Sequence, residues 1–230
     1  MVYPSITPEF MAGLCNGITQ AVSGHPLDTI KVLQQNNKNW NTLKFKELMR
    51  GLQYPLTYKI ITKSITFDLN NKIDVKNDFI RGAITGVYLT PITHALDLYK
   101  IKRQNGLNIH SINLYDFLNY RALLCTLARD TIAYSLYIPV YIRLRNKDYN
   151  PFIAGGIAGL VNWSASYPID VIRTRQIIHN KNTIKKSINM GSLKNGYIPC
   201  VLRAMLTSSI GFFVFEQSLY FIKSNNLIYK

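Results

Sequence analysis

Acidic residues and cysteines are both scarce in this sequence. Its 230 residues include 12 Asp and Glu against 27 Lys and Arg, which gives a formal net charge of +15. Charged residues make up only 17 % of the chain and hydrophobic residues 47 %, so a disordered basic tail is excluded, because such segments contain few apolar residues. The three cysteines, Cys15, Cys125 and Cys200, are far apart and odd in number, which excludes a disulfide framework and a zinc-finger spacing.

The sequence also lacks the usual marks of an enzyme. Its four histidines share no metal-ligand spacing, and it contains no Gly-x-x-x-x-Gly-Lys segment for binding phosphate. We therefore expect no enzymatic activity, no cofactor and no metal. The excess of basic residues leaves one alternative from another class, a basic nucleic-acid-binding protein. No recognised nucleic-acid-binding motif accompanies the charge, so we expect no nucleic-acid partner.

One pattern occurs three times along the chain. Each copy begins with Phe-x-x-Gly-x-x-x-Gly, at residues 10–17, 79–86 and 152–159. An aspartate follows fifteen residues after the first glycine, and a basic residue follows three residues later. These pairs are Asp28 and Lys31, Asp97 and Lys100, and Asp170 and Arg173. Such regular spacing indicates an internal repeat, which determines the architecture.

Prolines and a second half complete each repeat. Pro26 and Pro168 lie two residues before their aspartates, whereas the second repeat has its proline, Pro91, one helical turn earlier. The second halves are rich in apolar residues and carry one early base each, at Lys59, Arg129 and Arg203. We therefore predict one domain, 1–230, built from three repeats of about 5–75, 76–147 and 148–230. Each repeat should contain two long helices separated by a polar segment.

Long uninterrupted apolar runs are few, so membrane insertion has to be argued. Residues 10–27 and 149–169 contain no charged residue, but charges interrupt the other four predicted helices. Either the chain is a basic soluble helical repeat, or six helices surround a wet cavity that the interrupting charges face. Gly-x-x-x-Gly pairs, mid-helix prolines and basic residues clustered in 36–50, 98–121 and 173–195 favour the membrane. The predicted fold is an all-α membrane protein with six transmembrane helices in three tandem pseudo-threefold repeats.

The repeated Pro-x-Asp-x-x-Lys/Arg segments, residues 26–31 and 168–173, resemble the signature of the mitochondrial carrier family. The second halves, for example residues 121–130 and 196–204, are similar to that family's even-numbered helices. The resemblance implies a monomeric multi-pass transporter of the mitochondrial inner membrane, in contact with the bilayer and with anionic lipid such as cardiolipin. The short chain and its bias toward Asn, Ile, Lys and Tyr also resemble the carrier-like proteins of giant DNA viruses, which would imply a host mitochondrion.

The family resemblance also implies two gates. The matrix gate would be a ring of ion pairs made by Asp28, Lys31, Asp97, Lys100, Asp170 and Arg173. Gln35 and Gln104 would brace it, whereas Gln176 is one residue out of place, and Pro26, Pro91 and Pro168 would mark helix kinks. The outer gate should be weak, because only Arg145 and Glu216 match the family's charged positions and Asn71 stands where the first repeat should carry an acid.

The residues that the resemblance assigns to the substrate are Lys59, Lys63, Arg129, Asp130 and Arg203. Converging cations in a low-dielectric cavity are costly unless an anion neutralises them. A polyphosphate suits several bases, so we expect exchange of nucleotides, including deoxynucleotides, by alternating access. Asp130 beside Arg129 favours the alternative, an amino-acid or carboxylate carrier of the same family in which Asp130 holds an α-ammonium group.

Overall fold

The computed structural model describes residues 7–35, 49, 52–104, 119–179, 183–194 and 196–225, and the side chains of residues 28–35, 54 and 100–104 lie outside this description. Within it the only regular elements are helices. The long helices are α1 (Pro8–Gln35), α3 (Gln53–Lys72), α4 (Asp78–Gln104), α6 (Tyr120–Arg145), α7 (Pro151–Ile178) and α9 (Tyr197–Ser224), and the short helix α8 covers Ile184–Asn189. The prediction of an all-helical chain is therefore confirmed.

Several helix starts are fixed by local sequence. The Asn119 side chain accepts a hydrogen bond from the Ala122 amide at the start of α6, and Asn150 accepts one from the Phe152 amide at the start of α7. Such caps satisfy amides that the first turn leaves without partners. Gly196 precedes α9 with a φ of 80°, a left-handed conformation that glycine adopts without strain.

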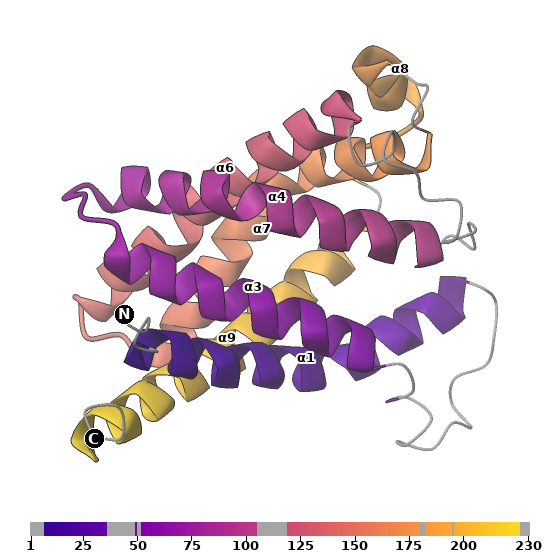
Figure 1. Ribbon diagram of the computed structural model, residues 1–230. Coiled ribbons are helices and arrows are strands. Elements are labelled where there is room, and N and C mark those ends of the chain that lie inside the picture. The colour runs from indigo at the N-terminus through magenta and orange to yellow at the C-terminus, as the bar shows by residue number, and fades with distance from the viewer. Residues whose placement is uncertain are drawn as a thin grey trace, which may run out of the picture.

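The six long helices form a closed ring in chain order. Each packs against the next, and α9 packs against α1. Helix α1 begins and α9 ends at one end of the bundle, and α8 lies at the opposite end (Figure 1). We call these the terminal end and the loop end. Helices α1, α4 and α7 run from the terminal end toward the loop end (Figure 1), so the repeated aspartates of α4 and α7 lie toward the loop end.

The repeated glycines lie where α1, α4 and α7 each pack against the following long helix. A Cβ added to Gly17 would lie 2.6 Å from the Lys59 carbonyl oxygen, and one added to Gly86 would lie 2.5 Å from that of Asp130. The matching glycine of α7, Gly159, faces the Ala204 carbonyl at 2.9 Å. Only glycine allows the helices to approach so closely.

These contacts also correct the alignment of the second halves. Lys59, Asp130 and Ala204 meet equivalent glycines, so the position before each of them is the equivalent of Arg129 and Arg203. In the first repeat that residue is Tyr58. Lys59, which the sequence spacing aligned with the two arginines, is one residue further along its helix.

The prolines lie inside continuous helices. Pro26, Pro91 and Pro168 fall within α1, α4 and α7, and each helix continues beyond its proline. Interior proline is poorly tolerated in soluble helices but is accommodated in membrane bundles, where neighbouring helices satisfy the freed carbonyls. The kinks themselves stay a prediction.

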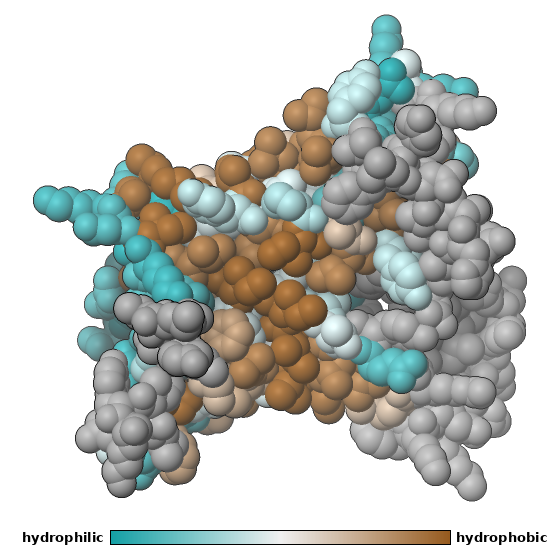
Figure 2. Space-filling model, viewed as in Figure 1, coloured by the Kyte–Doolittle hydropathy of each residue, from teal (hydrophilic) through white to brown (hydrophobic). Residues whose placement is uncertain are grey.

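The outer surface of the ring is apolar across its middle. Large hydrophobic side chains are widely exposed, including Tyr220 at 75 %, Ile198 at 68 % and Tyr88 at 64 %. Hydrophobic residues run as a band across the face in Figure 2, and hydrophilic residues lie mainly toward its ends. Soluble monomers rarely expose apolar patches of this size, so this is the surface expected of a bundle surrounded by lipid.

By length and composition alone, one described helix, α9, is long and apolar enough to cross a membrane. A single such helix is a weak indication of membrane insertion. The charge-free stretches of α1 and α7, which the sequence pointed to, do not reach this level. They lack charge but are not strongly apolar, because residues such as Asn16, Gln20 and Asn162 interrupt them. The count of six spans therefore stays a prediction.

Candidate functional site

One face of α6 lines the interior of the ring from end to end. Asp130, Tyr134, Tyr137, Tyr141 and Arg145 recur at spacings of three or four residues, which places them on one side of a helix. Asp130 lies toward the loop end and Arg145 closes the helix at the terminal end. The contacts of these five side chains therefore divide the interior into successive layers.

The layer toward the loop end is a cluster of ion pairs between helices. Arg173 of α7 bonds to Asp97 of α4 through a short contact and to Asp170 on its own helix at 2.8 Å. The Arg173 and Asp97 side chains are 5 % and 6 % exposed. Burial of this degree makes the pair sensitive to loss of either partner, because the remaining charge would be left without compensation.

Arg129 joins the same cluster from α6. Its guanidinium lies 2.5 Å from Asp130, 3.3 Å from Asp170 and 3.4 Å from Asp97. The Thr93 hydroxyl donates a short hydrogen bond to Asp130 on the other side. We call Asp97, Arg129, Asp130, Asp170 and Arg173 the ion-pair cluster. It holds three carboxylates and two guanidinium groups, so these described side chains carry one negative charge in excess.

Part of the predicted matrix gate lies outside the described side chains. This applies to Asp28, Lys31, Gln35, Lys100 and Gln104. The described members Asp97, Asp170 and Arg173 are brought together as the spacing predicted. Gln176 is fully buried, and its amide donates to the Ser187 hydroxyl at 2.7 Å, which ties α7 to α8.

A polar layer lies next along α6, around Tyr137. The Gln20 amide of α1 donates to Asn16 at 2.9 Å and to the Tyr137 hydroxyl at 3.3 Å, and that hydroxyl donates to Ser208 of α9 at 3.4 Å. The Lys63 ammonium of α3 lies 4.2 Å from the Tyr137 ring centroid. We call Asn16, Gln20, Lys63, Tyr137 and Ser208 the central layer, and four helices contribute to it.

Two other predicted cations, Lys59 and Arg203, make contacts that differ from those of Arg129. The Lys59 ammonium donates to the Gln20 carbonyl at 2.9 Å. A Cβ added to Gly24 would lie 3.8 Å from that ammonium and 4.0 Å from Nε of Arg203. The structure therefore brings Lys59 and Arg203 together beside Gly24, whereas Arg129 is held by the ion-pair cluster.

An aromatic layer follows toward the terminal end. Tyr141 stacks on Phe212 with ring centroids 3.6 Å apart, Phe67 stacks on Phe215 at 4.0 Å, and the two pairs meet edge to face at 5.8 Å. This layer was not predicted from the sequence. The spacing from Tyr137 to Tyr141 and from Phe212 to Phe215 is the signal that could have found it.

Arg145 and Glu216 form an ion pair at the terminal end. Two parallel contacts of 2.7 Å join the guanidinium and the carboxylate, and the Tyr141 hydroxyl donates to Glu216 at 2.5 Å. The side chains are 32 % and 28 % exposed. The pair that the sequence proposed is therefore present as a contact, and Asn71 is exposed.

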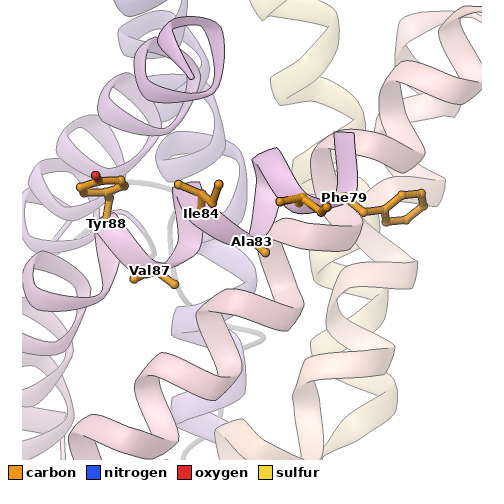
Figure 3. Close-up of a pocket in the computed structure, with 6 residues that line it drawn as sticks. Phe79, Ala83, Ile84, Val87 and Tyr88 are labelled. Atoms are coloured by element: carbon orange, nitrogen blue, oxygen red, sulfur yellow. The ribbon is translucent and has the colours of Figure 1, made fainter. Parts of the chain in front are cut away.

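A shallow apolar groove on α4 is separate from these layers. Figure 3 shows it along one side of that helix, lined by Phe79, Ile80, Ala83, Ile84, Val87 and Tyr88. Ile80 and Val87 are about half exposed. The groove belongs to the outer apolar surface and not to the interior site.

Comparison with known proteins points to the same family as the repeated motif. The family model described as "Mitochondrial carrier protein" matches residues 144–226. The chain is 27 % identical to the mitochondrial arginine transporter BAC2 of Arabidopsis thaliana, over 73 % of the chain and 72 % of that protein. It is 22 % identical to mitochondrial substrate carrier family protein D of Dictyostelium discoideum, over 98 % of the chain and 92 % of that protein. The human mitochondrial basic amino acids transporter is 25 % identical over 73 % and 70 %.

These matches support membership of the mitochondrial carrier family.

Membership confirms the resemblance seen in the repeated motif. Mitochondrial carriers are multi-pass proteins of the mitochondrial inner membrane, so this carrier is assigned to that membrane. The family moves solutes and does not transform them, which agrees with the expectation of a transporter and not an enzyme. Two of the relatives above are named for arginine or basic amino acids.

Proposed function

We propose that this carrier exchanges a basic amino acid, arginine or a close analogue, across the mitochondrial inner membrane. The observation that carries the proposal is the state of Arg129, whose guanidinium contacts three carboxylates. An arginine with three acidic neighbours is not a free positive site for a polyanion. The same carboxylates, Asp130 above all, suit a cationic solute.

The charge balance favours this substrate over the nucleotide that the sequence led us to expect. A polyphosphate would add negative charge to a cluster whose described side chains already hold three carboxylates against two guanidinium groups. A cation would instead reduce that excess. The names of the relatives, an arginine transporter and basic amino acids transporters, support the same alternative.

The transport mechanism we propose is alternating access with a gate at each end. Three repeats, 5–75, 76–147 and 148–230, would supply six membrane-spanning helices of a monomer. The matrix gate would be Asp28, Lys31, Asp97, Lys100, Asp170 and Arg173 at the loop end, braced by Gln35 and Gln104. The outer gate would combine the Arg145–Glu216 pair with the aromatic layer.

Arg129 would couple the substrate to the matrix gate. A solute cation that pairs with Asp130 competes for the carboxylate that lies closest to Arg129. Arg129 also contacts Asp97 of α4 and Asp170 of α7, so a change in its position alters ion pairs between two helices. Binding energy of the solute would thereby offset part of the cost of opening the gate.

Uptake by proteoliposomes tests the substrate. Purified carrier is reconstituted with internal arginine in one set of liposomes and internal ADP in another, and entry of labelled arginine, lysine, ADP and dATP is measured in both. We expect arginine or lysine to exchange and the nucleotides not to exchange. Asp130→Asn should abolish amino-acid exchange, because the cation loses its partner. Exchange of ADP or dATP without exchange of amino acids would overturn the proposal and restore the nucleotide interpretation.

A further inference from the structure

The central layer contains a cation without an acidic neighbour. Among the described side chains, no carboxylate lies within 4.0 Å of the Lys63 ammonium, which instead contacts the face of the Tyr137 ring. Tyr137 is 1 % exposed and is contacted from α1, α3 and α9. A lysine inside a membrane bundle normally pairs with an acid or faces a functional pathway. Lys63 does not have the acid.

A second donor in this layer has no acceptor. Asn16 is fully buried, its oxygen accepts from Gln20, and its amide nitrogen has no hydrogen-bond partner among the described residues. Buried polar atoms are almost always satisfied, so an orphan donor needs an explanation. Lys63 and Asn16 are linked through Tyr137 and Gln20, and both lack an acceptor. Together they present the chemistry that binds a carboxylate.

The distance between this layer and Asp130 suits a dibasic amino acid. Gly13 packs against the Lys63 carbonyl as Gly82 packs against that of Tyr134, so Lys63 and Tyr134 lie at equivalent levels. Tyr134 and Tyr137, whose ring the Lys63 ammonium contacts, are four and seven residues beyond Asp130 on α6, which corresponds to rises of about 6 and 10 Å. Six covalent bonds separate the carboxyl and guanidinium carbons of arginine, which corresponds to roughly 7 Å when the molecule is extended, at about 1.5 Å per bond.

We propose that Lys63 and Asn16 form a subsite for the α-carboxylate of the transported amino acid. This inference rests on the proposed function and gives the substrate an orientation. The cationic side chain lies toward Asp130 and the loop end, and the carboxylate lies toward Tyr137 and the terminal end. The subsite makes the carrier selective for amino acids over amines of the same length that lack the carboxylate.

Comparing the binding of arginine with that of its decarboxylated analogue agmatine isolates the contribution of this subsite. Binding is measured for each compound from the ligand-induced rise in unfolding temperature of the detergent-purified carrier, and uptake is measured in proteoliposomes. The wild type should bind arginine more tightly than agmatine. Lys63→Gln should weaken arginine binding roughly ten- to hundredfold, the usual effect of losing a charge-assisted hydrogen bond, and leave agmatine binding unchanged.

Three further variants control the comparison. Lys72→Gln removes a lysine of the same helix that pairs with Asp68 near the surface, and it should leave the ratio of the two affinities at the wild-type value. Lys63→Arg keeps the charge and should keep most of the ratio. Asn16→Leu removes the second donor with little change in volume and should lower the ratio by a smaller factor, so the subsite is still tested if Lys63→Gln fails to fold.

The outcomes distinguish the subsite from the proposed function. If Lys63→Gln weakens arginine and agmatine equally, or leaves their ratio unchanged, Lys63 has a structural role and the subsite is wrong, while arginine transport by the wild type still supports the proposed function. If the wild type binds neither compound and transports ADP, the proposed function is wrong and the subsite is rejected with it.

Discussion

The ion-pair cluster and the Arg145–Glu216 pair join helices at opposite ends of the same interior, and they differ in burial and in number of partners. Arg173 and Asp97 are about 5 % exposed, whereas Arg145 and Glu216 are about 30 % exposed. The cluster shares two guanidinium groups among three carboxylates, whereas the outer pair is a single contact supported by Tyr141. Ion pairs that water reaches contribute little to stability, so the packing of the terminal end depends mainly on its aromatic layer.

Removal of Arg173 should have the largest effect on stability. Arg173→Ala leaves Asp97 buried with Arg129 as its remaining described cation, at 3.4 Å. Loss of one partner from a buried ion pair costs about 3–5 kcal/mol. We expect this decrease in the free energy of unfolding of the purified carrier, followed by denaturation in detergent.

Two matched variants sharpen that measurement. Arg121→Ala on α6 removes an arginine whose described contacts are with neighbouring Tyr120, and it should change stability by less than about 0.5 kcal/mol. Arg173→Ala combined with Asp97→Ala should be more stable than Arg173→Ala alone, because it lowers the excess of the cluster from two negative charges to one, as in the wild type. A double variant as unstable as the single one would show that the ion pair does not account for the loss.

Truncation of Phe212 should have the next largest effect, at the opposite end. Phe212 is fully buried, stacks on Tyr141 and also contacts Tyr137 at 5.1 Å between centroids. Phe212→Ala should cost about 3 kcal/mol through lost contacts and the cavity left behind. The exposed Phe213 on the same helix is the control, and Phe213→Ala should cost much less. Equal losses for the two variants would mean that the aromatic layer does not hold the outer end together.

Widening the close contact between α4 and α6 should have an effect of intermediate size. A Cβ at Gly86 would lie 2.5 Å from the Asp130 carbonyl oxygen, so Gly86→Ala pushes apart the helices that carry Asp97, Asp130 and Arg129. Overpacking of this kind costs about 1–3 kcal/mol. Because the displaced carbonyl belongs to Asp130, the rate of arginine exchange should fall by more than the loss of folded carrier explains. Ala128→Leu on the exposed side of α6 should affect neither, and similar behaviour of both variants would contradict the role of the glycine.

Local spacing was sufficient to predict the helices, and the family resemblance predicted one ion pair. The repeated glycines, aspartates and prolines specify three similar units, and the six long helices follow from them. The family's charged motif on the even-numbered helices pointed to Arg145 and Glu216, although they lie 71 residues apart. These features depend on patterns within a repeat, which a single sequence displays.

The environment of Arg129 could not be predicted in the same way. Two of its three carboxylates, Asp97 and Asp170, come from other helices, and the spacing assigned them to a separate gate. Counting bases without their partners led to the nucleotide preference. Lys59 was misaligned because a slip of one residue is invisible until the glycine contacts fix the relative positions of α1 and α3. The partners of Arg129 and the alignment of Lys59 both depend on packing between helices.

Loss of the Arg145–Glu216 pair should have the smallest effect of the four changes. Arg145→Ala removes a bidentate contact, but both side chains are about 30 % exposed, and exposed pairs contribute about 0–1 kcal/mol. A double-mutant cycle with Glu216→Gln, measured at about 0.05 M and 0.5 M salt, isolates the pair. The interaction energy should stay below about 1 kcal/mol and decrease at the higher salt concentration, since the Debye length shortens. An interaction energy above about 3 kcal/mol, insensitive to salt, would place the outer pair in the same class as the ion-pair cluster and remove the difference between the two ends.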